Sequence, residues 1–139
     1  VADIQKPDAI IIGTAYGMLD QGEKILDHIA ESGEEGLSPT LFMQSTHNTI
    51  AGTLATRLKC HGYNITYSQG EKSWDLAIAD AKQLISEGKA ENVLVGVHDF
   101  CPEYFRHIFE YAGIDVPSEI ISRSVIVSKY KKGKEENGE

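Results

Sequence analysis

The sequence has little cysteine, few basic residues and no long apolar run. Its two cysteines, Cys60 and Cys101, are too few for a disulfide framework, and their spacing does not fit a zinc site. Lysine and arginine number 13 against 21 acidic residues, so the formal net charge is −8. This balance argues against the basic surface that nucleic acid or an anionic membrane needs. The longest apolar runs, such as 9–12 and 93–97, are too short to cross a bilayer.

These absences favour a cytoplasmic protein that binds neither nucleic acid nor a membrane, and we expect no metal and no cofactor. The 139 residues, 41% of them hydrophobic, suit one domain with one modest core. We expect this domain to span residues 1–130 and a charged, flexible tail to span residues 131–139. Because the chain begins with Val1 rather than Met, we expect a processed product or a fragment of a longer protein.

The hydrophobic pattern alternates between strands and helices. Short β-branched runs predict strands at 8–13, 65–68, 92–97 and 119–129. Apolar residues at helical spacing predict helices at 20–30, 46–58, 73–87 and 102–112, with a loop at 33–39 between the first two. This order predicts an α/β fold with a mostly parallel sheet and helices on both faces.

Three segments together resemble a known family. In the first, a proline and a phenylalanine at 39–42 precede the segment 45–52, which contains an asparagine and begins a helix with small residues. The second is a strand-to-helix turn at 62–78. The third is the apolar run 92–99, which ends on an acidic residue. Their order and spacing resemble the amino-terminal half of a thiolase-fold β-ketoacyl synthase. The likeness is greatest to the short ketosynthase-like or chain-length-factor type, such as those beside full synthases in aryl-polyene and flexirubin-type pigment pathways.

The resemblance implies that Glu71 occupies the position of the family's nucleophilic cysteine. A carboxylate cannot hold an acyl group as a thioester, so this chain is expected to lack that step. At the amino terminus of a helix, Glu71 could accept N–H bonds from the first turn and block the acyl site. The alternative interpretation is an exposed first-turn acid with no further role. Both interpretations stay open at this point.

The resemblance also implies a partner. In thiolase-fold enzymes the strand before the nucleophile pairs with its mate across a twofold axis, and Ile65, Thr66, Tyr67 and Ser68 match that strand. An apolar edge strand needs covering. We therefore expect these residues at the interface of a homodimer or of a heterodimer with a full-length ketosynthase. An acyl carrier protein is a further expected partner.

Two functions follow from the resemblance. The first is a non-catalytic β-ketoacyl-synthase-like subunit that pairs with an active ketosynthase in acyl chain assembly of the fatty-acid or polyketide type. The alternative is a fragment of a 3-oxoacyl-carrier-protein synthase or related acyltransferase, in which Glu71 serves as acid or base. The family's two catalytic histidines belong to its carboxy-terminal half, and the five histidines of this chain are not their equivalents.

Three other patterns are weaker. His98 and Asp99 could form a polar dyad, but neighbours on a strand point to opposite faces, which favours a structural turn. Cys101, before a proline at a helix start, has the better electrostatic case for a lowered thiol pKa, although an inert thiol is favoured. The segment 13–17 lacks the third glycine of a dinucleotide loop and is interpreted as a turn. No Gly-x-Ser-x-Gly elbow supports a serine nucleophile.

Overall fold

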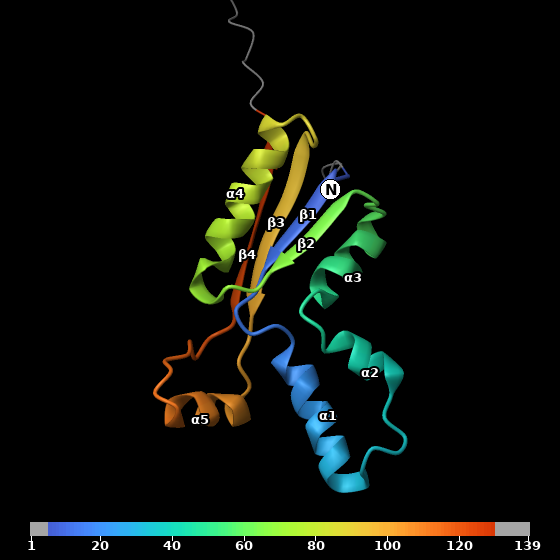
Figure 1. The fold of residues 1–139 in the computed structure, drawn as a ribbon, viewed down its shortest axis with the longest axis vertical. Helices are drawn as coiled ribbons and strands as arrows, with labels where there is room; N and C mark the ends of the chain where they lie inside the picture. The colour runs from blue at the N-terminus through green and yellow to red at the C-terminus, as the bar shows by residue number, and fades with distance from the viewer. Residues whose placement is uncertain (1–5, 130–139) are drawn as a thin grey trace, which may run out of the picture.

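The computed structural model describes residues 6–129, which form a single mixed sheet with helices packed on it (Figure 1). The strands lie in the order β2-β1-β3-β4. Strands β1 and β2 are parallel, β1 and β3 are parallel, and β4 is antiparallel to β3. The bounds are Ala9–Gly13 for β1, Tyr63–Tyr67 for β2, Asn92–Asp99 for β3 and Ile121–Ser128 for β4. The predicted α/β class and mostly parallel sheet are confirmed.

Helices cover both faces of the sheet, as predicted. On one face α4 (Ser73–Ser86) packs its small residues Ala77 and Ala81 against β1 and β3. On the other face α3 (Thr49–Leu58) packs Ala51 against Ile10 and Ile12 of β1. Strand β1 is buried along its whole length because it has a strand on each side and a helix on each face. A continuous apolar run is the sequence pattern of such a strand.

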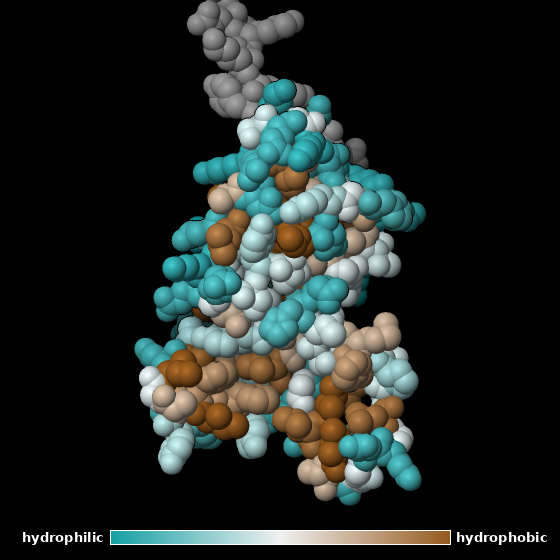
Figure 2. Space-filling view, viewed as in Figure 1, coloured by the Kyte–Doolittle hydropathy of each residue, from teal (hydrophilic) through white to brown (hydrophobic). Residues whose placement is uncertain are grey.

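Three further helices lie beyond the carboxyl ends of the parallel strands (Figure 1). They are α1 (Leu19–Ser32), α2 (Pro39–Gln44) and α5 (Glu103–Tyr111), and none of them contains a buried residue. Figure 2 shows large brown areas over this part of the molecule. The exposed apolar side chains there are Leu26, Ile29, Phe42, Met43, Tyr104, Ile108 and Tyr111. Such a contiguous apolar surface is typical of a face that another chain or domain covers.

The predicted helix over 46–58 is present as α3 but begins three residues later, and the helix before it, α2, was not predicted. Helix α2 begins at Pro39, where the Ser38 hydroxyl accepts a hydrogen bond from the Leu41 N–H at 3.3 Å. It ends because the hydroxyls of Ser45 and Thr46 donate to main-chain carbonyls of the preceding turn. Helix α3 then begins only at Thr49. A short polar turn at 45–48 thus separates a helix that the sequence pattern did not predict from one that it did.

Other boundaries differ by a few residues. Pro102 is the N-cap of α5 and does not lie in its first turn. A short 3-10 turn, η1 (Gly70–Lys72), precedes α4. The expected tail at 131–139 lies outside the described residues, and the extent of the domain over 1–130 stays a prediction. Within residues 6–129, no helix is long and apolar enough to cross a membrane, and no three His, Cys, Asp or Glu side chains are placed to share a metal ion.

Candidate functional site

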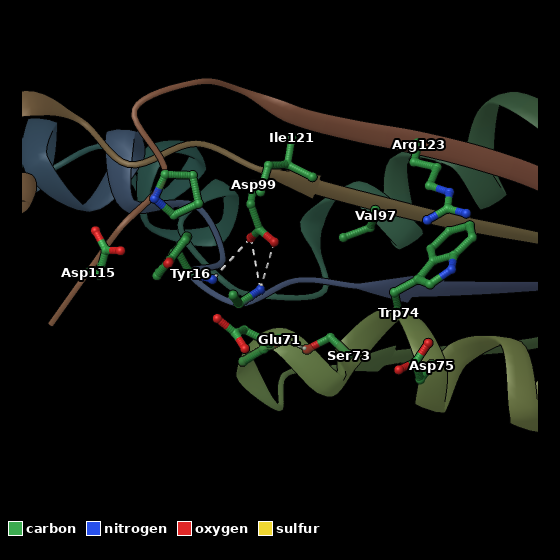
Figure 3. A pocket seen from close by; sticks show the side chains of 13 residues that line it. Tyr16, Glu71, Ser73, Trp74, Asp75, Val97, Asp99, Asp115, Ile121 and Arg123 are labelled. Carbon is green, nitrogen blue, oxygen red and sulfur yellow. Dashed lines mark hydrogen bonds between the residues drawn. The ribbon is translucent and has the colours of Figure 1, made fainter.

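A pocket of about 310 Å³ lies where β1 and β3 end and α4 begins (Figure 3). The turn after β1 supplies Tyr16, η1 supplies Glu71, and the first turn of α4 supplies Trp74. Residues after α5 and the start of β4 complete the wall, among them Asp115 and Arg123. Binding sites of open parallel sheets commonly lie at this position, beyond the carboxyl ends of the strands.

The floor of the pocket is held by Asp99, the last residue of β3. Its buried carboxylate accepts hydrogen bonds from the Thr14 hydroxyl at 2.7 Å, the Ala15 N–H at 2.8 Å and the Tyr16 N–H at 3.1 Å. The Thr14 hydroxyl in turn accepts from the N–H of Gly17 at 2.8 Å. Asp99 therefore organises the turn after β1. The interpretation of 13–17 as a turn is confirmed, and so is the structural role of Asp99 at the end of β3.

The amino terminus of α4 is held by Ser73. Its buried hydroxyl accepts from the Gln69 N–H at 2.8 Å and donates to the Gly70 carbonyl at 2.8 Å. A side chain at Gly13 would place its Cβ 2.9 Å from the main chain of Ser73, so β1 and α4 approach more closely here than any larger residue allows. Because the Ser73 hydroxyl is engaged with the main chain, it has a structural role.

Glu71 lies in η1, in the turn between β2 and α4, and lines the pocket. Its side chain is exposed, and its carboxylate has no hydrogen-bond or ion-pair partner among residues 6–129. The hydrogen bonds expected from the first helical turn to Glu71 are not formed, and the Ser73 hydroxyl instead accepts the N–H of Gln69, which precedes η1. Glu71 is thus free to face a ligand or a partner.

The two ends of the pocket differ in charge. At one end the guanidinium of Arg123 stacks on Trp74, 4.4 Å from the ring centroid, and the carboxylate of Asp75 lies near the same end (Figure 3). At the other end Tyr16 lies near Glu71 and Asp115. The pKa of the Tyr16 phenol is raised, first by burial and then by nearby negative groups that include Asp99, Glu71 and Asp115. This end therefore has a negative electrostatic potential.

The predicted interface strand lies at the edge of the sheet. Ile65, Thr66 and Tyr67 belong to β2 and are half-buried, whereas Ser68 follows the end of the strand and is exposed. Strand β2 pairs only with β1 among the described residues. The hydroxyl oxygen of Thr66 is buried and has no hydrogen-bond partner in this part of the chain. The structure thus leaves an edge available, and the interface itself stays a prediction.

A tyrosine pair that the sequence analysis missed joins β2 to α4. The hydroxyls of Tyr63 and Tyr67 each donate to the same carboxylate oxygen of Asp80, at 2.9 Å. Burial and this hydrogen bond raise the pKa of Tyr63 to about 12. The spacing of four residues puts both tyrosines on one face of a strand, which is a detectable pattern. Their shared acceptor on α4 leaves no pattern in the sequence.

The two cysteines are free and buried, as predicted. Burial raises the pKa of the Cys101 thiol, and this effect exceeds the lowering by Arg106. The electrostatic argument for a lowered thiol pKa at Cys101 was therefore wrong, and the interpretation of an inert thiol stays a prediction.

The fold and the pocket define a thiolase-like ketosynthase architecture. A chain in the structure of the ketosynthase ApeO in complex with its chain length factor ApeC, from Xenorhabdus doucetiae, matches with a TM-score of 0.75 at 24% identity, over 92% of this chain and 52% of that chain. The ishigamide ketosynthase/chain length factor matches with a TM-score of 0.74 at 19% identity, over 91% and 37%. A Streptomyces oxazolomycin ketosynthase domain matches with a TM-score of 0.58 at 18% identity, over 81% and 18%.

The family model for the β-ketoacyl synthase N-terminal domain matches residues 2–127, so the chain belongs to the β-ketoacyl synthase family. The chain spans about half or less of each of these solved structures. No curated protein matches the sequence. The resemblance inferred from the three sequence segments is confirmed.

Proposed function

We propose that this chain is a non-catalytic β-ketoacyl-synthase-like subunit that pairs with an active ketosynthase in acyl chain assembly. The observation that carries the proposal is Glu71, which lies between β2 and α4 where the resemblance places the nucleophile. A carboxylate there cannot form the acyl thioester of the condensing reaction. The described residues near it supply no substitute, since the Ser73 hydroxyl is bonded to the main chain and Cys101 is buried.

Two of the structural neighbours support the pairing. One is a ketosynthase in complex with its chain length factor, and the other is a ketosynthase/chain length factor. Their identity to this chain is low, so the likeness by itself supports only the fold. Together with family membership and Glu71 it favours a chain-length-factor role in a polyketide-type pathway over one in fatty-acid synthesis. An acyl carrier protein would then meet the active partner, in whose site the chemistry takes place.

Strand β2 supplies a surface for the pairing. The N–H of Thr14 donates to the carbonyl of Tyr67 at 2.9 Å, so the main-chain groups of Tyr67 point toward β1. Because these groups alternate along a strand, those of Asn64 and Thr66 point outward. An antiparallel strand from a ketosynthase, or from a second copy of this chain, could bond to them.

The native mass tests the proposal, measured for the chain alone and after co-expression with a full-length ketosynthase from the same genome. We expect a one-to-one heterodimer. Thr66→Pro should abolish it, because proline removes the outward N–H without removing a bond to β1. Thr66→Ala keeps that N–H and is the matched control. A mass unchanged by Thr66→Pro would show that β2 is not the interface.

The second candidate function is an acyltransferase or 3-oxoacyl-carrier-protein synthase of which this chain is one part. The half-length match to ApeO with ApeC favours it, together with the pocket beside Glu71. In that case restoring the missing half should give turnover with an acyl thioester donor, and Glu71→Gln should remove it. The subunit proposal predicts no turnover in either form.

A further inference from the structure

We propose that the end of the pocket formed by Glu71, Asp115 and Tyr16 receives the guanidinium group of an arginine side chain from the partner ketosynthase. The inference rests on the proposed function, because it assigns a specific contact to that pairing. It concerns recognition between two chains and no chemical step.

The charged groups that line the pocket favour a cation. Four of the residues that line the pocket carry a carboxylate, and one, Arg123, carries a positive charge. Asp99 is buried and its oxygens are satisfied by the turn after β1. Glu71 and Asp115 have no ion-pair partner among residues 6–129. Two unpaired carboxylates at one end of a cavity favour a cationic guest over a neutral or anionic one.

The shape of the pocket suits a guanidinium. A volume of about 310 Å³ is ample for one long side chain, and Tyr16 adds an aromatic wall at the acidic end. The same pocket already holds one guanidinium, that of Arg123 on Trp74. A planar guanidinium can stack on an aromatic ring and donate to two carboxylates at once, whereas an ammonium is a point charge that does neither as well. These properties favour arginine over lysine.

The position of the pocket fits a pairing along β2. Glu71 follows closely on the end of β2, the edge strand whose outward main-chain groups are unpaired in the described part of the chain. No residue of β2 itself lines the pocket, but Gly70 and Glu71 do, and they come three and four residues after Tyr67, the last residue of β2. A partner strand along β2 would therefore approach the pocket from the Glu71 side, and its arginine would enter at the acidic end. The net charge of −8 adds a long-range attraction for a basic surface.

The isolated chain allows a direct test by isothermal titration calorimetry, which detects binding at either end of the pocket. The chain is titrated with N-acetyl-arginine amide and, at equal ionic strength, with N-acetyl-citrulline amide, which has the same shape without the charge. We expect the arginine probe to act at a concentration about tenfold lower. The double variant Glu71→Gln/Asp115→Asn should lose this preference. The control Asp27→Asn/Glu34→Gln, which changes the net charge equally at exposed distant sites, should keep it.

Equal responses to the two probes, or a preference that survives in the pocket variant, would overturn the proposal. In the complex with the ketosynthase, we expect the pocket variant to raise the Kd about tenfold and the control less than about twofold. A complex that is insensitive to the pocket variant overturns the pocket inference alone. A chain that prefers the arginine probe and forms no complex with any ketosynthase overturns the proposed function instead.

Discussion

The carboxylate of Asp99 accepts a 2.7 Å hydrogen bond from the hydroxyl of Thr14, a residue 85 positions earlier in the chain. This bond ties the end of β3 to the turn after β1. The same carboxylate accepts the N–H groups of Ala15 and Tyr16, so one side chain sets the shape of a three-residue turn. Since Tyr16 is a wall of the pocket, Asp99 connects the sheet to the site without itself needing to meet a ligand.

We predict that Asp99→Asn destabilises the chain. The amide oxygen can replace the carboxylate oxygen that accepts all three bonds, but the NH₂ group then takes the place of the other oxygen, 3.0 Å from the Ala15 nitrogen, so one donor faces another in a buried site at a cost of about 1–3 kcal/mol. Urea denaturation should show a lower midpoint with an unchanged slope. Asp27→Asn, on the exposed surface of α1, is the matched control. Equal midpoints for the two variants would contradict the role given to Asp99.

Gly13→Ala tests the close approach of β1 and α4. The new Cβ would lie 2.9 Å from the main chain of Ser73, which cannot move aside as a side chain could. We expect a loss of about 1–3 kcal/mol in the free energy of unfolding. Gly52→Ala is the control, because nothing lies within 4 Å of the added Cβ and alanine favours helix by about 0.5–1 kcal/mol. The midpoint temperature of thermal unfolding should thus fall for Gly13→Ala and rise for Gly52→Ala.

These two sites mark what the sequence could and could not predict. The run 9–13 identified β1, because β-branched residues next to a glycine are typical of a buried strand. The pair His98 and Asp99 was recognised as the end of β3, but its hydrogen-bond donors are distant in the chain and leave no local pattern. The chemistry of Asp99 is therefore a product of the fold, whereas the strand that carries it is a product of local composition.

Helix α2 was missed for a different reason. Six residues are too few to display a helical period, so the apolar residues of 39–44 did not stand out. A usable pattern existed, because Ser38 before Pro39 is a common start of a helix. Glu71 shows the converse case. Its position followed from the resemblance, while the residue that holds the turn, Ser73, is identified only by the contacts of its hydroxyl.

The tyrosine pair on β2 predicts that the free energy of unfolding decreases at high pH. The folded pKa of Tyr63 is raised from 10.0 to about 12, and that of Tyr67 is raised for the same reasons, burial and the bond to Asp80. A phenol whose pKa is higher in the folded chain than in the unfolded chain stabilises the fold. This stabilisation is complete below pH 10 and is lost as the pH rises toward 12. Denaturation at a series of pH values should show this decline.

Asp80→Asn should flatten the decline, because it removes the negative charge and the hydrogen bond that favour the neutral phenols. Absorbance titration of tyrosinate should show two phenols ionising at lower pH in that variant. The double variant Tyr63→Phe/Tyr67→Phe serves as the control, since it lacks both phenols. If its stability fell as steeply as that of the unchanged chain between pH 10 and 12, the decline would have another source.

The last prediction concerns the thiols, on which the absence of an acyl site depends. Cys60 and Cys101 are 6% and 3% exposed, and burial raises the pKa of Cys101. Because the thiolate is the nucleophile, both should resist iodoacetamide in the native chain at neutral pH and react after unfolding. Ser68→Cys places a thiol at an exposed site beyond the edge strand and should be alkylated at least about tenfold faster. Mass spectrometry after timed quenching measures all three. Rapid native labelling of Cys101 would identify a reactive thiol in the chain and would weaken the case for a non-catalytic subunit.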